Sequence, residues 1–205
     1  MNVLAIISVV FAYIIGSISF SYLMARWVKG VDIREHGSGN AGATNTLRVL
    51  GKIPAITVLT LDALKGVFAV YLGYLLVGNT PYVLALCGMF AIFGHNWPVF
   101  LRFRGGKGVA TTIGVVVSLV FYAGLISGII AILLIIITRF VSLGSLVFTV
   151  GLPFTVLALQ DHYPEPYLWL SIVIAVLAIV RHKRNIKSLF QGTERKIGQT
   201  EGEKQ

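Results

Sequence analysis

The sequence predicts an all-α membrane protein that crosses the bilayer several times. Of the 205 residues, 56% are hydrophobic and only 12% are charged, against about a quarter in an average soluble domain. The mean hydropathy is +0.84. Residues 108–138 and 140–160 contain no Asp, Glu, Lys or Arg, and apolar runs of about 20 residues are typical of transmembrane helices. We therefore expect a single membrane domain over residues 1–205, with no soluble domain attached.

The first expected span covers residues 3–25. Its apolar run of about 23 residues is too long for the h-region of a signal peptide, and no basic residue precedes Arg26. We therefore expect a retained helix. The lone cysteine, Cys87, lies within a later apolar run and has no partner for an intramolecular disulfide.

The basic residues lie in alternate connections, and this asymmetry predicts the orientation of the chain. Apart from Lys65, all Lys and Arg residues fall between Arg26 and Lys52, between Arg102 and Lys107, at Arg139, or in the tail from Arg181 onward. The connections at 77–81 and 160–166 contain none. Because basic loops remain cytoplasmic, we expect the N-terminus outside and the C-terminus in the cytoplasm. In a membrane protein, the net charge of +9 favours contact with anionic lipid over nucleic acid.

Parity then sets the number of crossings. Residues 109–138 should begin and end on the cytoplasmic side, and a single helix of that length would span about 45 Å, more than the roughly 30 Å apolar core. We expect two short crossings there, with a turn near Gly124 and Gly128, and hence seven helices. A five-helix alternative would make this segment a re-entrant hairpin on the cytoplasmic side. The four remaining spans are expected at residues 53–77, 82–100, 142–159 and 167–181.

The first cytoplasmic loop, about residues 27–52, has the composition of a phosphate site. Gly37 and Gly39 permit backbone conformations that turn successive N–H groups toward one point. Arg48 can bind an oxyanion through two hydrogen bonds. A flexible, solvated loop is the plainer alternative, because glycine and asparagine also favour it. Further donors in this loop are Ser38, Thr44, Asn45 and Thr46.

The second cytoplasmic loop, about residues 94–108, contains three cations and three glycines from Arg102 onward, without a nearby acid. Glycines beside Lys107, followed at once by an apolar helix, would place backbone N–H groups and the positive helix end at one point. That arrangement binds anions. The spacing does not fit the nucleotide P-loop G-x-x-x-x-G-K-[ST]. Plain membrane anchors would explain the cations but would leave Gly105, Gly106 and Gly108 unexplained.

The third cytoplasmic segment, about residues 181–197, is strongly basic at its start, which suits anionic lipid headgroups. Within it, His182 and Asn185 are three positions apart and so share one helical face. They could point at the same site as the other two loops. Ser142 lies at the same membrane surface, although a lone serine in an apolar helix usually bonds back to its own backbone.

For four other polar residues, the sequence allows either a functional or a purely structural role. Asp62 and Lys65 lie three positions apart within the second span. Charges at that depth either serve a function or form a simple internal ion pair. His36 and His95 could act as general bases, because imidazole titrates near neutrality, but hydrogen bonding at a helix end is the commoner role.

Three stretches resemble the cytoplasmic motifs of the bacterial acyl-phosphate:glycerol-3-phosphate acyltransferases, the PlsY family. They are GSGNAGATNTLRVLGK from Gly37, GHNWPVFLRFRGGKGVAT from Gly94 and RHKRNIKSLFQGTE from Arg181. The resemblance covers nearly the whole chain. It implies transfer of a fatty acyl group from acyl phosphate to the 1-hydroxyl of sn-glycerol 3-phosphate. The products would be lysophosphatidic acid and inorganic phosphate, in the first step of phospholipid biosynthesis.

The same resemblance implies seven helices in the bacterial inner (cytoplasmic) membrane, an active site facing the cytoplasm, and no cofactor or metal. The expected partners are the substrates acyl phosphate and glycerol 3-phosphate together with membrane lipid. We expect no nucleic acid, and the sequence indicates no oligomeric state. The residues expected to be catalytic are Ser38, Arg48, Lys107, His182 and Asn185. Those expected to bind substrate are Gly39, Asn40, Thr44, Asn45, Arg104, Gly105, Gly106, Gly108 and Ser142.

Other classes of membrane protein fit less well. None of the four histidines has Asp five positions on, so the chain lacks the His-x-x-x-x-Asp motif of acyltransferases that use acyl-CoA or acyl carrier protein. This absence favours acyl phosphate as the donor. An anion or phosphate transporter is the main alternative, and it would need charges or broken helices near mid-membrane. A metal-dependent phosphotransferase would need clustered acids, and a structural membrane protein would leave the glycine-rich loops without a purpose.

Overall fold

The computed structural model describes residues 2–199, and the all-α prediction is confirmed for this part of the chain, which contains no strand. Three short 3-10 helices connect the α-helices, at Ile33–Glu35, Val99–Leu101 and Gln160–His162. The α-helices are α1 (Val3–Ser17), α2 (Phe20–Lys29), α3 (Ala43–Leu50), α4 (Lys52–Val77), α5 (Pro81–Asn96), α6 (Val109–Leu119), α7 (Phe121–Thr138), α8 (Val141–Ala158), α9 (Glu165–Arg181) and α10 (Lys183–Phe190).

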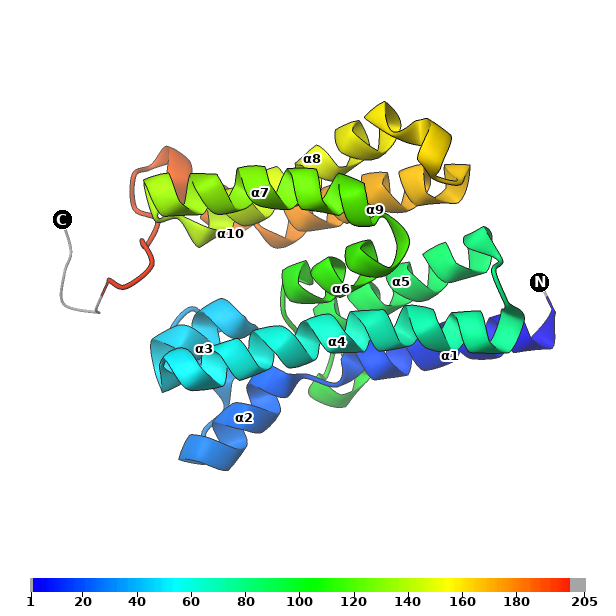
Figure 1. Ribbon diagram of the computed structural model, residues 1–205. Helices are drawn as coiled ribbons and strands as arrows, with labels where there is room; N and C mark the ends of the chain where they lie inside the picture. Colours follow the sequence, from blue (N-terminus) through cyan, green and yellow to red (C-terminus); the bar gives the residue numbers. More distant parts are fainter. Residues whose placement is uncertain (1, 200–205) are drawn as a thin grey trace.

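The helices form two layers (Figure 1). One layer contains α1 to α6, and the other contains α7 to α10. The contact of α5 with α9 joins them, and a continuous apolar core runs through both layers. Its members include Leu84 on α5, Val115 on α6, Leu152 on α8 and Ile174 on α9.

Within residues 2–199, five segments are long and apolar enough to cross a membrane, and there are six if the pair α9 and α10, bent by 63°, is counted as one span. The helix α6 is apolar but has only 11 residues. At about 1.5 Å per residue it would cover roughly 16 Å, about half of the apolar core. The turn after α6 accordingly lies short of the outer ends of α1 and α4 in Figure 1. The number seven therefore remains a prediction.

The turn within residues 109–138 does not lie where the sequence suggested. Val120 leaves the helical conformation, with φ −141° and ψ 52°, and separates α6 from α7. Gly124 and Gly128 lie inside α7, so their assignment to the turn was wrong. A Cβ on Gly124 would stand 2.1 Å from a methyl carbon of Val116. This glycine allows α7 to pack closely against α6 and does not turn the chain.

The polar segments expected on the cytoplasmic side also contain short helices. The short helix α3 contains Thr44, Asn45 and Arg48, and α10 contains Asn185. In the first span, the chain leaves the helical conformation at Ile18 and Ser19, so that α1 and α2 are separate helices.

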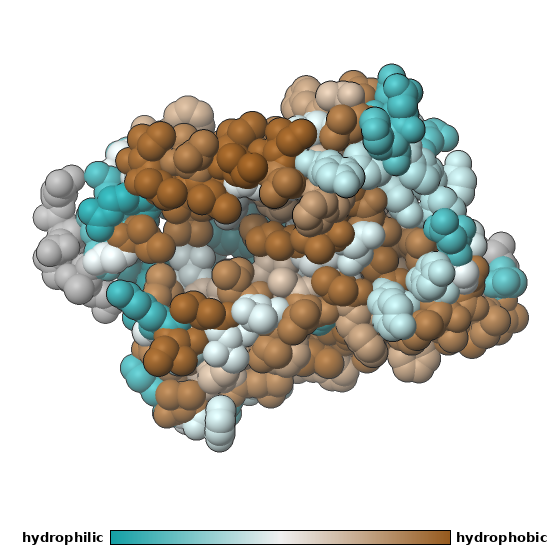
Figure 2. Space-filling model, in the orientation of Figure 1, coloured by the Kyte–Doolittle hydropathy of each residue, from teal (hydrophilic) through white to brown (hydrophobic). Residues whose placement is uncertain are grey.

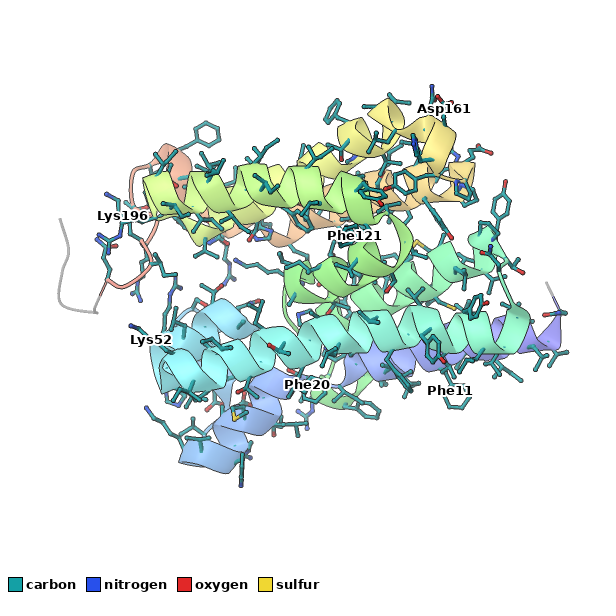
Figure 3. All side chains as sticks on the ribbon, in the orientation of Figure 1. Phe11, Phe20, Lys52, Phe121, Asp161 and Lys196 are labelled. Atoms are coloured by element: carbon teal, nitrogen blue, oxygen red, sulfur yellow. The ribbon has the colours of Figure 1, made fainter. Side chains whose placement is uncertain are left out.

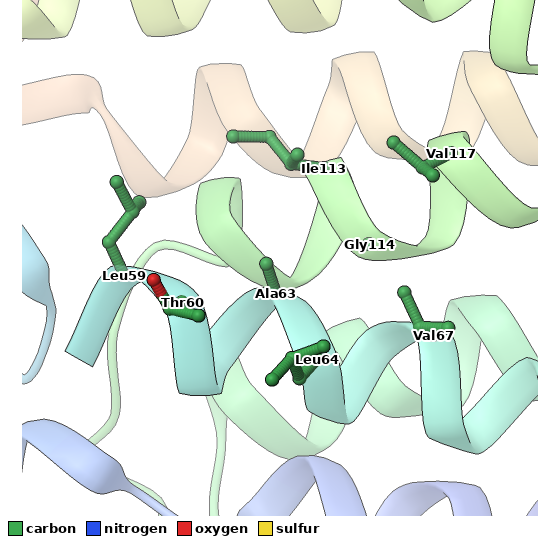
Figure 4. Close-up of a pocket in the computed structure, with 8 residues that line it drawn as sticks. All are labelled: Leu59, Thr60, Ala63, Leu64, Val67, Ile113, Gly114 and Val117. Atoms are coloured by element: carbon green, nitrogen blue, oxygen red, sulfur yellow. The ribbon is translucent and has the colours of Figure 1, made fainter. Parts of the chain in front are cut away.

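Close packing between α4 and α6 fixes where α6 begins. A Cβ on Gly114 would stand 1.9 Å from the carbonyl oxygen of Ala63, and one on Gly66 would stand 2.4 Å from that of Thr111. Small residues at the interface are the usual way for membrane helices to approach this closely. Figure 4 shows Ala63 and Gly114 facing each other in an apolar groove lined by larger side chains such as Leu59 and Val117.

Charged residues mark the two ends of the molecule. Figure 3 places Lys52 and Lys196 at one end and Asp161 at the opposite end. The surface between them is predominantly hydrophobic, with hydrophilic residues gathered toward the ends (Figure 2). At the basic end, near α3 and α10, Figure 2 also shows a hollow between the two layers with hydrophilic residues inside it.

We predict that Gly114→Ala destabilises the protein, because its new Cβ would collide with the Ala63 carbonyl. Overpacking of this kind costs about 1–3 kcal/mol, which lowers the unfolding midpoint by roughly 2–12 °C for a chain of this size. The measurement is thermal unfolding in detergent. Gly128→Ala is the matched control, because no atom lies within 4 Å of its Cβ position. Equal midpoints for the two variants would contradict the close approach of α4 and α6.

Candidate active site

The first part of the site is the segment that leads from α2 into α3, and Asn45 organises it. Asn45 is 1% exposed. Its Oδ1 accepts a hydrogen bond from the Ser38 N–H (2.8 Å), and its Nδ2 donates to the carbonyls of Ile33 (3.1 Å) and His36 (3.0 Å). Gly37 has a left-handed φ of 59°, and a Cβ there would stand 2.3 Å from Asn45 Oδ1. Asn45 therefore fixes the loop that carries Ser38.

Arg48 lies on the last turn of α3, close enough to the C-terminal segment to interact electrostatically with Glu194 and Arg195. Desolvation is the main cause that lowers its pKa, followed by the charge of Arg195, while Glu194 opposes the shift. Arg48 thus belongs to the same electrostatic cluster as the tail. The other predicted residues of this segment are Gly39, with a left-handed φ of 70°, and the partly buried Asn40 and Thr44.

The second part is the glycine loop that precedes α6. The Gly106 N–H donates to the His95 carbonyl at 3.0 Å. A Cβ on Gly105 would stand 2.1 Å from the same oxygen, and one on Gly106 would stand 2.0 Å from His95 Nε2. The loop therefore packs directly on the end of α5, and both glycines are required. Gly108, with φ 82°, then starts α6, whose first N–H groups lack intrahelical acceptors and can receive an anion.

Lys107 is partly buried, and its Nζ donates to Asn185 Oδ1 at 2.5 Å. Burial is the main cause that lowers the pKa of Lys107 to about 8, and the charges of Arg48 and Arg181 act in the same direction while Glu194 opposes them. Lys107 is therefore mostly charged at neutral pH. This contact also joins the two layers, because Asn185 lies on α10.

Arg181, at the end of α9, holds the glycine loop from the other side. Its Nη2 donates to the carbonyls of Gly106 (2.6 Å) and Gly105 (3.2 Å), and its Nε also reaches Gly106 (3.0 Å). The guanidinium stacks over the Trp97 ring, 5.4 Å from its centroid. These bonds satisfy the Gly105 and Gly106 carbonyls and fix the backbone of the loop.

Glu194 connects the C-terminal segment, about residues 181–197, to α8. Its Oε1 accepts hydrogen bonds from Ser142 Oγ (2.5 Å) and Asn185 Nδ2 (2.7 Å). Ser142 therefore does not bond back to its own helix, which is the usual habit of a lone serine. One carboxylate fixes two of the predicted site residues relative to each other.

His182 is 2% exposed and lies just after α9. Its Nδ1 donates to the Ala178 carbonyl at 2.8 Å, which leaves the lone pair on Nε2. Burial is the main cause that lowers the pKa of His182 to about 4, and the positive charge of Lys107 adds to it. The imidazole is therefore neutral near pH 7 and available as a hydrogen-bond acceptor.

The structure brings most of the predicted residues together. Lys107, Asn185, Ser142 and Arg48 surround Glu194, through hydrogen bonds or charge, and His182 feels the charge of Lys107. The first segment meets the glycine loop where the Ala41 carbonyl stands 2.6 Å from a Cβ position on Gly106. Arg104 is different: it is exposed, and no described side chain or backbone group bonds to its guanidinium.

Sequence reasoning missed two residues. Arg181 was assigned to lipid headgroups along with the other tail bases, because sequence alone gives no sign that its guanidinium turns inward. Glu194 was not singled out, although it is the first acid after the basic run that starts at Arg181. An isolated carboxylate beside a basic cluster was a usable signal for an internal partner.

Comparison with known proteins gives consistent matches. A family model described as glycerol-3-phosphate acyltransferase matches residues 6–192. The glycerol-3-phosphate acyltransferase of Shouchella clausii is 53% identical over 201 residues, 97% of this chain and 98% of that protein. The enzyme of the same name from Halalkalibacterium halodurans is 54% identical over 193 residues, 93% and 94% of the two chains.

Two solved structures match as well. Both are crystal structures of PlsY, an integral membrane glycerol 3-phosphate acyltransferase, in its glycerol 3-phosphate and lysophosphatidic acid forms. The first has a TM-score of 0.88 and 40% identity, covering 95% of this chain and 96% of the other. The second has a TM-score of 0.85 and 39% identity, covering 95% of each chain.

We predict that the affinity for glycerol 3-phosphate falls as the pH rises above about 8, because Lys107 then loses its proton. The ligand remains a dianion over this range, since the second pKa of a phosphate monoester is near 6. Binding measured by calorimetry from pH 7 to 9.5 should weaken by up to about tenfold per pH unit above the pKa. In Lys107→Arg, any remaining binding should be independent of pH, because arginine keeps its charge. An unchanged wild-type affinity at pH 9.5 would contradict the role of Lys107.

Proposed function

The chain belongs to the glycerol-3-phosphate acyltransferase family, and on that premise we propose that it transfers a fatty acyl group from acyl phosphate to the 1-hydroxyl of sn-glycerol 3-phosphate. The observation that carries the proposal is the position of Lys107. It lies partly buried on a glycine loop at the start of α6, and it contacts the C-terminal segment. A charged lysine beside free helix N–H groups suits a phosphate.

The proposed chemistry follows from the donor. Acyl phosphate is a mixed anhydride and is already activated, so neither an acyl-enzyme nor a metal is needed. The glycerol O1 attacks the acyl carbon, the bond from that carbon to the phosphate oxygen breaks, and inorganic phosphate leaves. The site has to hold two phosphate groups at near-attack distance despite their like charges. Lys107 and Arg48 would reduce this repulsion and stabilise the departing phosphate.

We assign the remaining polar groups from the resemblance of their motifs to those of the family. Ser38, Gly105, Gly106 and Lys107 would line the phosphate sites, and Arg48, Ser142, His182 and Asn185 would hold glycerol 3-phosphate. The Nε2 lone pair of His182 suits a hydrogen bond from the glycerol hydroxyl. With a pKa of about 4, His182 is a weak base, which favours a substrate phosphate oxygen as the proton acceptor.

Three of the predicted substrate-binding assignments can now be refined. The side chain of Asn45 forms its hydrogen bonds with the first segment itself, so we propose that it shapes the loop around Ser38 and does not touch substrate. The exposed Arg104 would reach the bilayer surface. The role of Gly108 would be to adopt the left-handed φ with which α6 begins, and not to contact substrate through a side chain. We retain Gly39, Asn40 and Thr44 as substrate-facing residues of the first segment.

We further propose seven crossings in the bacterial inner membrane, with the N-terminus outside and the site facing the cytoplasm. Support comes from the charges, since Lys52 and Lys196 lie at the end that carries the site and Asp161 lies at the other (Figure 3). Under the positive-inside rule, the basic end is cytoplasmic.

We predict that Lys107→Met lowers the rate of lysophosphatidic acid formation by about a hundred- to a thousandfold, because the cation that stabilises the leaving phosphate is lost. The assay uses purified protein in liposomes with palmitoyl phosphate and glycerol 3-phosphate. Lys183→Met is the matched control, because Lys183 is exposed on the neighbouring helix α10 and should be dispensable. Wild-type turnover in folded Lys107→Met would contradict the assignment of Lys107 to the leaving phosphate.

We predict that Tyr122→Cys reacts with a membrane-impermeant maleimide added outside intact cells. Tyr122 is 64% exposed at the start of α7, and in a seven-helix topology that end lies outside. Cys87, the native thiol, is fully buried. The exposed Asn79 and Lys52 provide the outside and inside controls as single cysteine variants. Labelling of Tyr122→Cys only after lysis would support the re-entrant, five-crossing topology.

A further inference from the structure

Three ionisable side chains that the proposed reaction does not use are buried together beneath the glycine loop. Asp62 on α4 is 1% exposed, and Lys65 on α4 and His95 on α5 are each 5% exposed. Lys65 Nζ lies 2.7 Å from Asp62 Oδ1 and 3.0 Å from His95 Nδ1. The sequence left open whether the first two residues serve a function or form a simple pair. The structure adds a histidine to the pair.

The hydrogen bonds fix how the histidine is used. An ammonium has three donors and no lone pair, so His95 Nδ1 accepts from Lys65 and the ring proton is on Nε2. Nε2 faces the glycine loop, since a Cβ on Gly106 would stand 2.0 Å from it. The backbone of His95 supports the same residue, because its carbonyl accepts the Gly106 N–H. The imidazole and the loop backbone are therefore in direct contact.

Lys65 also donates a hydrogen bond to a different part of the chain. Nζ donates to the Ile18 carbonyl at 2.6 Å, where α1 ends. A cation at the end of a helix satisfies a carbonyl that has no intrahelical partner and matches the helix dipole. Here it stabilises the break between α1 and α2. The helix α2 leads into the first segment, and Ser21 Oγ is hydrogen-bonded with Thr46 Oγ1 of α3 at 2.9 Å.

One buried ammonium thus connects to both halves of the predicted phosphate site. Through His95 it supports the loop that carries Lys107, and through Ile18 it supports the segment that carries Ser38 and Arg48. The two segments meet at Ala41 and Gly106, directly above the histidine. A shift at His95 or at Ile18 would therefore change the distance between Lys107 and Arg48, the cations that would face the substrate phosphates.

Stability alone gives no reason to keep these charges. Replacing a buried ion pair by apolar residues of similar volume is often neutral or stabilising, whereas charges inside a membrane span are rare. Both carboxylate oxygens of Asp62 are also buried without a hydrogen-bond partner among the described residues, although Oδ1 lies in ion-pair contact with Lys65 Nζ. We propose that Asp62, Lys65 and His95 are positioning residues that set the geometry of the phosphate site. The inference rests on the proposed function in one respect, namely that the loop binds a phosphate group.

The test replaces the pair without leaving a lone buried charge. We expect the double variant Asp62→Leu/Lys65→Met to fold with a lower unfolding midpoint, because the Ile18 carbonyl and His95 Nδ1 lose their donor. Its affinity for glycerol 3-phosphate, measured by calorimetry without acyl donor, should fall about tenfold or more. In the assay, KM for glycerol 3-phosphate should rise by a similar factor. The control is Ser127→Ala/Thr155→Val, which removes a buried hydrogen-bonded pair between α7 and α8, away from the loop, and should bind normally.

A folded double variant with wild-type affinity and KM would overturn the proposal, because the pair would then serve only the fold. If the double variant does not fold, His95→Asn decides the matter. Its Oδ1 can still accept from Lys65, but the shorter side chain does not reach Gly106. We expect it to fold and to lose affinity for glycerol 3-phosphate about tenfold, and wild-type affinity would overturn the proposal. Because binding is measured without acyl donor, failure of the proposed acyl transfer would appear separately, as wild-type binding without turnover.

Discussion

The position of the Gly105–Lys107 loop is the constraint on which the rest of the site depends. Arg181 binds its carbonyls from the α9 side, and His95 supports it from the α5 side. With the backbone fixed in this way, Lys107 reaches Asn185 across the two layers. The loop is thus both a structural joint between the layers and the place where a phosphate would bind.

The bilayer explains why polar side chains gather around this loop. In a bilayer, every backbone polar group has to be satisfied within the protein, so polar side chains concentrate where helices end or break. The buried ammonium of Lys65 caps the end of α1, and Glu194 gathers Ser142 and Asn185 at the start of α8. Close helix contacts through Gly66 and Gly114 bring α6 near enough for its N-terminus to enter the same cluster.

The sequence predicted much of this organisation, and for physical reasons. Apolar runs define spans, basic connections define one membrane side, and the glycines beside Lys107 indicate an anion site. It could not place the turn at Val120, because glycines that allow helix packing look the same in sequence as glycines that turn the chain. The inward direction of Arg181 and the bond between Glu194 and Ser142 arise from contacts between residues about 50 to 75 positions apart, which no local pattern encodes.

The most direct test of the account is the choice of acyl donor. Purified protein in lipid would receive glycerol 3-phosphate with palmitoyl phosphate, palmitoyl-CoA or palmitoyl carrier protein in parallel, without added metal. The account predicts lysophosphatidic acid and equimolar inorganic phosphate from palmitoyl phosphate alone. Product from either thioester donor would contradict it. The absence of product with all three donors, in a sample that is folded and binds phosphate, would also contradict it.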